Sequence, residues 1–483
     1  MKKNFFMPLG YFGNLWRTII FLAGFILLCF LYTLLPDSEP EPWVNGVVVT
    51  PRNDSSYNET PMRPDTEDVI DSTCYDLTKY CPIPGNQGMW GTCTAWACTY
   101  AARTICEAVD SNWTDTQKIT SEVFSPWYIF TQINNRLDCK GGSFPGDALD
   151  TMKSNGVCKK SVYDVECNSA VPPEILPFGA KYKIDDYFRL FASYDYARGD
   201  AEEDSLRLVR IKRAIINNHP VIIASKVYGS FHRPTDVWDG DMRGNYGLHA
   251  MCVVGFCDDK YDGAFLIQNS WGTNWADGGR VWIKYEDFLN ITGYAWEMYM
   301  KPHYPDGLNH FEGAFTLLKE SGEPIEVQLD ESQGVKYYTI DRAIGEDTKF
   351  RCKLENKEPA YVYMIGGNSV DADLFFPYDR YTSPALVYRP NNIVNIPKVK
   401  DDYFVVESAQ RDNYFCLLFS PDPIDLYQFA ENFNQETGDF MTKVTKTLST
   451  RMVAGYDIEY TNDKISFKSK TRGKIVAIFV KLN

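Results

Sequence analysis

The chain has 483 residues, of which 44% are hydrophobic, so it is long enough for two or three domains with a sizeable core. Its formal net charge of −15 argues against nucleic acid as a partner, because phosphate binding needs a basic face. Ten of the thirteen cysteines lie between Cys74 and Cys257, which indicates disulfides and an oxidising compartment. The sequence does not determine which cysteines pair.

An apolar run near the N-terminus predicts a membrane anchor. Residues 18–35 contain eighteen residues without a charge, just enough to cross a bilayer as a helix. Basic residues precede this run and acidic residues follow it, so residues 1–17 are expected in the cytoplasm and the rest outside, in an extracellular, lumenal (lysosome-like) or periplasmic space. A cleaved signal peptide is the alternative, although bulky residues follow the run where a cleavage site needs small ones.

The segment after the predicted anchor has the composition of a stalk. Residues 36–73 are rich in proline and in acidic and small polar residues, and this composition forms a poor core. Four Asn-X-Ser/Thr sequons are candidate glycosylation sites if the host is eukaryotic and the sites are lumenal: Asn53, Asn58, Asn112 and Asn290.

The stretch GNQGMWGTC, residues 85–93, places a glutamine six residues ahead of a cysteine at the start of a predicted helix. Thr92 suits an N-cap, so Cys93 is expected to be the first helical residue, where backbone N–H groups and the helix dipole favour a thiolate. The Gln87 amide and the backbone N–H of Cys93 then form two donors for an oxyanion. A structural cysteine at a helix end is the alternative reading of the same residues.

A second group of polar residues lies far downstream. His249 heads an apolar, β-branched run that predicts a buried strand, and Asn269 ends the next predicted strand. A thiolate needs a base partner, and that base needs an acceptor for its other ring nitrogen. Asn269 can supply this oxygen, and Trp271 can shield the pair from water. His219 and His232, by contrast, have the sequence surroundings of solvated surface residues.

The order of these features along the chain resembles that of the papain-like cysteine peptidases: Gln87, the QGMWGTC block, His249 and the NSWGTNW block. The resemblance extends over residues 74–301. The stretch DCKGGSFPGDALDTM is similar to the one that lines the substrate cleft of that family. The stretch RIKRAIINNHPVIIASKVYGSF is similar to the helix and strand ahead of its histidine. The resemblance implies a two-lobed α+β fold, with Cys93 on a helical lobe and His249 on a β-rich lobe.

The resemblance also implies roles for the site residues. It assigns four catalytic residues: Cys93 as nucleophile, His249 as base and later acid, Asn269 as the residue that orients the imidazole, and Gln87 as an oxyanion donor. Gly142 is expected to offer backbone hydrogen bonds to an extended substrate, and Trp271 to pack on the leaving-group side. Protein or peptide substrates are implied, without a metal or cofactor.

Several positions depart from the family pattern. Trp90 stands where many members have a cysteine, so Cys139 lacks its usual partner and must pair elsewhere or remain free. Thr94 replaces a common aromatic residue, and Ala276 stands where glycine is common. The stretch before Cys74 is too short for a folded helical prosegment, so the chain looks closer to prosegment-free, membrane-anchored members from bacteria and protists.

Residues 302–483 contain short aromatic or β-branched runs between turn-rich segments, which is typical of a β-sandwich-like domain. Residues 423–433 predict one helix in this region. Its expected apolar positions are Ile424, Tyr427, Ala430 and Phe433. Two roles for the domain stay open: packing or spacing, and binding of a substrate or surface partner.

Two classes of function fit the sequence. The first is a cysteine-type peptidase on the extracytoplasmic side of a membrane. The second is a catalytically idle adhesion or binding protein on the same scaffold. The intact set of four catalytic residues favours the peptidase. A third possibility is a cell-wall amidase of another fold, which also uses cysteine and histidine but gives no reason for the asparagine of the NSWG block or for Gln87 at its spacing. Residues 36–73 then have two candidate roles, as a simple tether or as a strap across the cleft that restrains activity.

Overall fold

The structure, a computed structural model, describes twelve segments of the chain. They are residues 46–49, 60–66, 70–134, 139–166, 170–300, 310–332, 334–340, 348–387, 392–399, 402–405, 413–471 and 474–482. The predicted cytoplasmic tail, the predicted anchor at 18–35 and most of the predicted stalk lie outside these segments. Within the segments, no helix combines the length and the apolar character needed to cross a membrane.

The first α-helix of residues 74–301 starts at Cys93, as the sequence predicts. Three helical stretches follow one another without a break and run to Asp110, and the middle one is π-helical. The side chains of Asp115 and Ser125 cap the next two helices by accepting backbone N–H bonds. The bounds are η1 (Thr78–Tyr80), α3 (Cys93–Ala95), η2 (Trp96–Arg103), α4 (Thr104–Asp110), α5 (Thr116–Ser121), α6 (Pro126–Ile133), α7 (Pro145–Ser154) and α8 (Leu176–Gly179).

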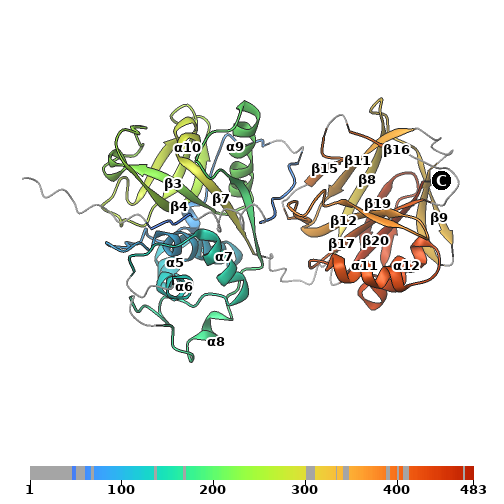
Figure 1. The fold of residues 1–483 in the computed structure, drawn as a ribbon, viewed down its shortest axis with the longest axis horizontal. Coiled ribbons are helices and arrows are strands. Elements are labelled where there is room, and N and C mark those ends of the chain that lie inside the picture. Colours follow the sequence, from blue (N-terminus) through green and yellow to red (C-terminus); the bar gives the residue numbers. More distant parts are fainter. Residues whose placement is uncertain are drawn as a thin grey trace, which may run out of the picture. The chain divides into compact units, whose positions relative to one another are not determined.

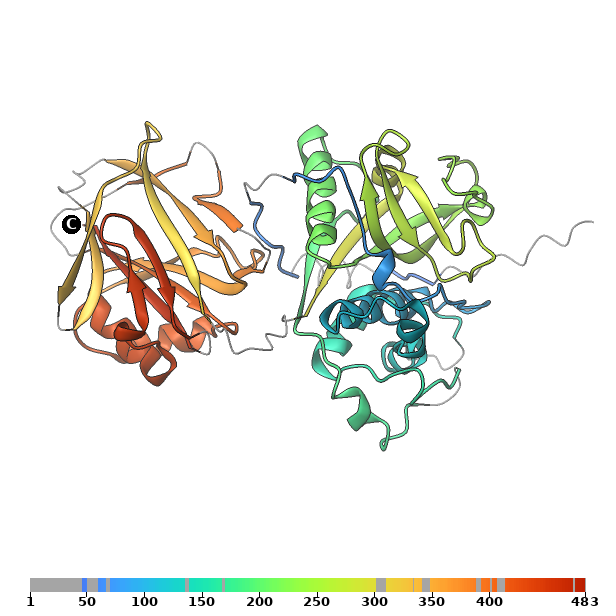
Figure 2. The same ribbon diagram turned by 180° about the vertical axis from the view of Figure 1, so that it is seen from behind.

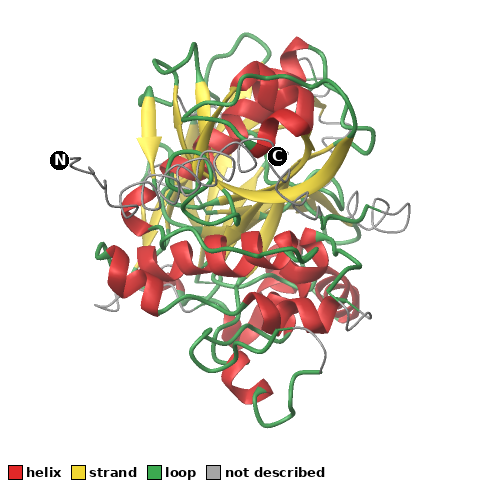
Figure 3. Ribbon diagram, turned by 90° about the vertical axis from the view of Figure 1, so that its left-hand side faces the viewer, coloured by secondary structure: helices red, strands yellow, loops and turns green. Residues whose placement is uncertain are grey.

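A seven-stranded antiparallel sheet forms the second part of this segment. Its strand order is β2-β7-β3-β4-β5-β6, and β1 pairs with β4. The strands are β1 (Cys74–Asp76), β2 (Asp186–Ala192), β3 (Val221–Tyr228), β4 (Tyr246–Cys257), β5 (Ala264–Gln268), β6 (Arg280–Lys284) and β7 (Thr292–Tyr299). Helices α9 (Ala201–Ile216) and α10 (Tyr285–Ile291) pack on this sheet, while α5 to α8 lie on its other side (Figures 1 and 3).

The sheet is buried because its inner strands consist mainly of apolar residues. Strands β3 and β5 are β-branched or apolar over most of their length, and nearly every residue in them is buried, as in a sheet covered on both faces. Strand β4 is central and pairs with β1, β3 and β5. The predicted strand around His249 and the predicted strand ahead of Asn269 are therefore confirmed as β4 and β5.

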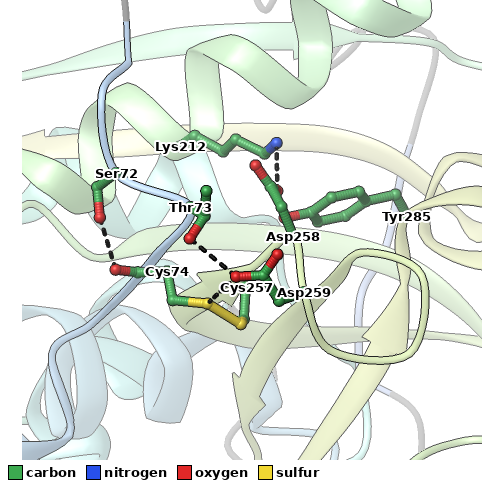
Figure 4. Close-up of a disulfide and its surroundings, with 8 residues drawn as sticks. All are labelled: Ser72, Thr73, Cys74, Lys212, Cys257, Asp258, Asp259 and Tyr285. Carbon is green, nitrogen blue, oxygen red and sulfur yellow. Dashed lines mark hydrogen bonds and ion pairs between the residues drawn. A yellow bond between two sulfur atoms is a disulfide. The ribbon is translucent and has the colours of Figure 1, made fainter.

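A disulfide between Cys74 and Cys257 joins β1 to the end of β4 (Figure 4). The adjoining carboxylate of Asp258 accepts hydrogen bonds from Lys212 of α9 and from the hydroxyl of Tyr285, each at 2.6 Å. The same end of the strand is thus held by a covalent bond, an ion pair and a hydrogen bond.

The expectation of disulfides is confirmed in part. Cys139 is also disulfide-bonded, so the absence of a cysteine at position 90 does not leave it as a thiol. Within the described segments, eight cysteines are free and buried: Cys81, Cys93, Cys98, Cys106, Cys158, Cys252, Cys352 and Cys416.

The C-terminal segment is β-rich, as expected, and consists of two sheets that share one apolar core. One sheet has the order β13-β12-β17-β20-β10-β9 with β14 beside β12, and the other has the order β15-β11-β8-β19-β18 with β16 beside β11. Phe315, Leu354 and Phe467 of one sheet meet Val362, Leu417 and Ile478 of the other in this core. Figure 2 shows the two sheets in orange, yellow and red, with two helices along one side.

The strands of this segment are β8 (Glu312–Lys319), β9 (Val327–Ser332), β10 (Val335–Ile340), β11 (Lys349–Asn356), β12 (Ala360–Gly367), β13 (Ala372–Phe376), β14 (Ala385–Leu386), β15 (Asn392–Ile396), β16 (Phe404–Val405), β17 (Tyr414–Ser420), β18 (Ile458–Tyr460), β19 (Ile465–Ser469) and β20 (Val476–Lys481). The helices are α11 (Leu426–Gln435) and α12 (Phe440–Leu448).

The helix predicted at 423–433 exists as α11, and two of its four predicted apolar positions are confirmed. Ile424 and Phe433 are buried, whereas Tyr427 is 90% exposed and Ala430 is exposed.

The helix begins only after Asp425, whose side chain caps it by accepting the N–H of Gln428. Within the helix the buried face is formed by Phe429 and Phe433, which are four positions apart. Tyr427 points away from that face, because two residues along an α-helix turn by about 200°.

The disulfide between β1 and β4 yields a stability prediction. Replacing both Cys74 and Cys257 by alanine is expected to lower the free energy of unfolding by about 2–5 kcal/mol, because the bond closes a long loop of the unfolded chain. The two cysteines are 183 positions apart in the sequence. Chemical denaturation of the variant and of the wild-type protein measures the difference. An unchanged free energy of unfolding would contradict a disulfide at this position in the folded protein.

Candidate active site

Cys93 is the first residue of α3 and is completely buried. Thr92 occupies the N-cap position as predicted, but its side chain makes no capping hydrogen bond. The sulfur accepts the backbone N–H of Ala250, with a distance of 3.4 Å between Sγ and N. Since Ala250 follows His249 on β4, this contact brings the helix start directly against the strand that carries the histidine.

His249 and Asn269 are joined across neighbouring strands. Nε2 of His249 lies 2.8 Å from Oδ1 of Asn269, and the backbone N–H of Ser270 also donates to that oxygen at 2.7 Å. Because Oδ1 only accepts, Nε2 carries the ring proton and Nδ1 keeps its lone pair. In the described part of the chain Nδ1 has no hydrogen-bond partner, so it is the nitrogen that can act as a base.

Trp271 covers this pair, as the sequence suggests. Its ring centroid lies 4.7 Å from that of His249, and its side chain is buried. His232 stacks on the same indole at 5.3 Å with an angle of 5° between the ring planes. The prediction that His232 is a solvated surface residue is therefore wrong. Burial, reinforced by the neighbouring Arg233, lowers the pKa of His232.

His219 is likewise not a solvated residue. Its Nδ1 contacts the buried carboxylate of Glu297 on β7, which also pairs with Arg63. The side chain of His219 is only 16% exposed. This contact was not predictable from local pattern, because Glu297 lies 78 positions further along the chain.

Gln87 is held in place by the residue that follows Asn269. Its Oε1 accepts the hydroxyl of Ser270 at 2.6 Å, and its backbone N–H donates to the carbonyl of Ser270 at 2.8 Å. Its Nε2 donates to the carbonyl of Trp90, also at 2.8 Å. These contacts fix the orientation of the amide. Ser270 was not expected to be a positioning residue, although it stands inside the NSWG block.

Gly142 lies where glycine is required. Its φ is +63°, and a Cβ atom there would lie 2.7 Å from the carbonyl oxygen of Gly46. Its own carbonyl accepts from the side-chain amide of Asn134 at 2.7 Å. The neighbouring Ser143 presents its backbone N–H and C=O to the site, and both form hydrogen bonds with the segment at 46–48. A substrate contact by Gly142 itself stays a prediction.

The replacements noted in the sequence have local explanations. The hydroxyl of Thr94 donates to the carbonyl of Ser143 at 2.9 Å, so a polar residue is useful at this position. Ala276 has a φ of +48°, a left-handed conformation that costs a non-glycine residue about 1–2 kcal/mol.

Burial controls the ionisation of the two reactive groups. It raises the pKa of Cys93 to about 11, although the N–H groups of Ala250, Gly46, Thr94 and Cys93 itself act in the opposite direction. It also lowers the pKa of His249 to about 4, against the effect of the bond to Asn269. At neutral pH this state therefore holds a thiol and a neutral imidazole. The helix start does favour a thiolate, as predicted, but desolvation outweighs it.

The described residues offer one grouping that resembles a metal site. Cys74, Cys257 and Asp259 lie close together, but the two sulfurs are bonded to each other and supply no thiolate ligands.

Residues 79–299 match the family model for papain family cysteine proteases. The chain is 28% identical over 241 residues to the uncharacterized peptidase C1-like protein L477 of Acanthamoeba polyphaga mimivirus, which covers 45% of this chain and 70% of that protein. It is 35% identical over 86 residues to the probable cysteine protease RDL2 of Arabidopsis thaliana, covering 17% of this chain and 22% of that protein.

Solved cysteine proteases are also similar to the chain. Xylellain of Xylella fastidiosa is 19% identical with a TM-score of 0.40, over 53% of this chain and 96% of its own. Digestive procathepsin L 3 of Tenebrio molitor is 15% identical with a TM-score of 0.41, over 53% of this chain and 77% of its own. The family match includes Cys93, His249 and Asn269, and it covers a little under half of the chain.

Proposed function

We propose that the chain is a cysteine-type peptidase that hydrolyses peptide bonds through a thioester acyl-enzyme. One observation carries this proposal: the sulfur of Cys93 is bonded to the residue after His249, and the ring of His249 is bonded to Asn269. A nucleophile, a base and a group that orients the base are thus contiguous.

The proposed reaction begins with proton transfer from Cys93 to Nδ1 of His249. The thiolate attacks the scissile carbonyl, and the oxyanion is stabilised by the N–H of Cys93 and the amide of Gln87. The imidazolium then gives its proton to the leaving amine. The bond between the carbonyl carbon and this nitrogen breaks, and the acyl group remains on Cys93 as a thioester. His249 next takes a proton from water, which attacks the thioester and releases the acid and the thiol.

The surroundings of His249 suit this cycle. Asn269 keeps Nε2 protonated and the ring oriented in both charge states. The indole face of Trp271 lies within the range in which an aromatic ring stabilises a cation, so it favours the imidazolium intermediate. We place the peptide substrate between two lobes, one formed by the helices after Cys93 and one by the sheet that contains β4.

The alternative, an idle binding protein on the same scaffold, is less well supported. A binding protein has no chemical need for an imidazole whose proton is fixed on one nitrogen by Asn269, nor for an amide of Gln87 fixed on both sides by Ser270 and Trp90. These contacts orient groups for a reaction.

We further propose that residues 18–35 anchor the protein and that residues 36–483 lie on the extracytoplasmic side. The disulfide between Cys74 and Cys257 and the oxidised state of Cys139 support an oxidising compartment. The direction of insertion follows from the basic residues that precede the apolar run.

The nucleophile is tested by Cys93→Ala. This change is expected to reduce peptide hydrolysis by at least about 10⁴-fold while the protein remains folded, because only the sulfur is lost. Cys106→Ala is the matched control, since Cys106 is a buried thiol further along the same helical run. Fluorogenic peptide assays measure the activity of each variant, and circular dichroism checks that each variant is folded. Equal activity of Cys93→Ala and wild type would end the peptidase assignment.

The oxyanion role is tested by Gln87→Ala. The expected result is a loss of kcat by about 10²–10³-fold with KM little changed, because the donor acts mainly in the transition state. Ser270→Ala is expected to cause a smaller loss of kcat, since the amide keeps its bond to Trp90. Gln132→Ala, which removes an amide bonded within α6, serves as the control. A rise in KM alone would instead assign Gln87 to substrate contact.

The orientation in the membrane is tested with sealed vesicles whose lumen is topologically outside. Residues 36–483 are expected to resist added protease until detergent opens the vesicles, because the basic side of the anchor stays in the cytoplasm. Degradation of the catalytic domain without detergent would reverse the proposed orientation. A mature N-terminus near Asp37 would show a cleaved signal peptide instead of an anchor.

A further inference from the structure

A small pocket lies between the helical run that begins at Cys93 and the part of the sheet that carries His249 and Asn269. Its walls come from η2, from β4 just after His249 and from the end of β5. Trp96, Tyr100 and Asn269 are among the lining residues, and all three are buried. The free volume of about 10 Å³ is close to the smallest that holds one water molecule.

The π-helical form of η2 explains how several of its residues reach this pocket together. In a π-helix the backbone hydrogen bonds join residues five positions apart, so residues four and five positions apart share a face. The lining residues of η2 have this spacing: Trp96, Ala97, Tyr100 and Ala101. Stretches of π-helix are rare and are frequently found at functional sites.

Two buried N–H groups of the lining residues have no hydrogen-bond partner within the described part of the chain. They are Nε1 of Trp96 and Nδ2 of Asn269. Trp96 is 5% exposed and Asn269 is 4% exposed, so bulk solvent does not supply the missing partner. Since an indole N–H and an amide N–H only donate, the partner that they need is a hydrogen-bond acceptor and not a cation.

Tyr100 can supply a third contact to such an acceptor. Its hydroxyl donates to the carbonyl of Ile83 at 2.9 Å, and the same oxygen still has the capacity to accept. A Cβ on Gly85, another lining residue, would lie 3.0 Å from Cζ of Tyr100, so the phenol end of this ring lies at the wall of the pocket. Buried water molecules usually make about three hydrogen bonds, which matches two donors and one acceptor in a space of this size.

We propose that one buried water molecule occupies this pocket, accepts the N–H groups of Trp96 and Asn269, and makes Trp96 a positioning residue for the amide of Asn269. This inference rests on the proposed function. Oδ1 of Asn269 accepts from Nε2 of His249 and from the N–H of Ser270, and the water holds the other end of the same amide. An amide held at both ends cannot rotate out of line with the imidazole, so Nδ1 of His249 stays directed as the base.

The water site is tested by crystal structures of the full chain and of its Trp96→Phe variant, at a resolution that shows ordered water. We expect density within hydrogen-bond distance of both donors in the wild-type protein, and weaker or no density in Trp96→Phe. An empty pocket in the wild-type crystal would overturn the proposal. Crystals grown in bromide distinguish water from a halide ion, because an anomalous bromide signal in the pocket would overturn the water.

The positioning role is tested by the kinetics of Trp96→Phe, which keeps an aromatic ring but removes the N–H. We expect kcat to fall about two- to tenfold with KM unchanged, as for the loss of one hydrogen bond. Trp127→Phe is the matched control, because Trp127 is also buried and its ring centroid lies 6.4 Å from that of Trp96. Its kcat is expected to be unchanged. Equal losses in the two variants would assign the effect to packing and overturn the positioning role.

Combination with Asn269→Ala supplies a readout that packing alone would not change. If Trp96 acts through Asn269, then adding Trp96→Phe to Asn269→Ala causes no further loss of kcat. Additive losses would overturn the positioning role. The rate of alkylation of Cys93 by iodoacetamide is measured in the same proteins, because it depends on the orientation of His249 but needs no peptide hydrolysis. Non-additive alkylation rates without hydrolysis in any of these proteins would support the water-held amide and overturn only the proposed peptidase.

Discussion

The candidate active site depends on one constraint: the sulfur at a helix start and the imidazole on a strand must keep their relative positions. The N–H of Ala250 on the sulfur connects the two elements, and the bond from His249 to Asn269 connects β4 to the end of β5. Both contacts use β4, which is held on both sides by neighbouring strands and covalently at its end by Cys257. The central position of β4 in the sheet thus fixes where Ala250 lies relative to Cys93 and where His249 lies relative to Asn269.

The burial that fixes this geometry also opposes the charges that the proposed reaction needs. A wholly buried thiol and a wholly buried imidazole are both most stable when neutral, and the directions of their pKa shifts agree with that. Backbone lies close to the pair as well, since Val47 donates its N–H to the carbonyl of Leu248, the residue before His249.

The residues recognised from sequence are those whose role is set by local pattern or by chemistry. Cys93 follows a threonine, a residue type common at the N-cap position, and the strands around His249 and Asn269 have clear apolar runs, so their positions were predictable. The stacking of His232 on Trp271 and the docking of Gly46 were not, because they join segments far apart in the chain. The inner face of α11 was predicted only in part, because positions spaced strictly by three residues turn gradually around a helix of 3.6 residues per turn.

Two close backbone approaches let residues 46–49 lie between the loop before Cys93 and β4. A Cβ on Gly46 would lie 2.2 Å from the carbonyl oxygen of Gly91, and a Cβ on Gly142 would lie 2.7 Å from the carbonyl oxygen of Gly46. Neither glycine therefore has room for a side chain. Val47 donates its backbone N–H to the carbonyl of Leu248 on β4, and Val48 donates to the carbonyl of Ser143, so this short segment is hydrogen-bonded both to the strand that carries His249 and to the residue after Gly142. The geometry around Cys93 thus depends on glycines as well as on the polar residues of the site.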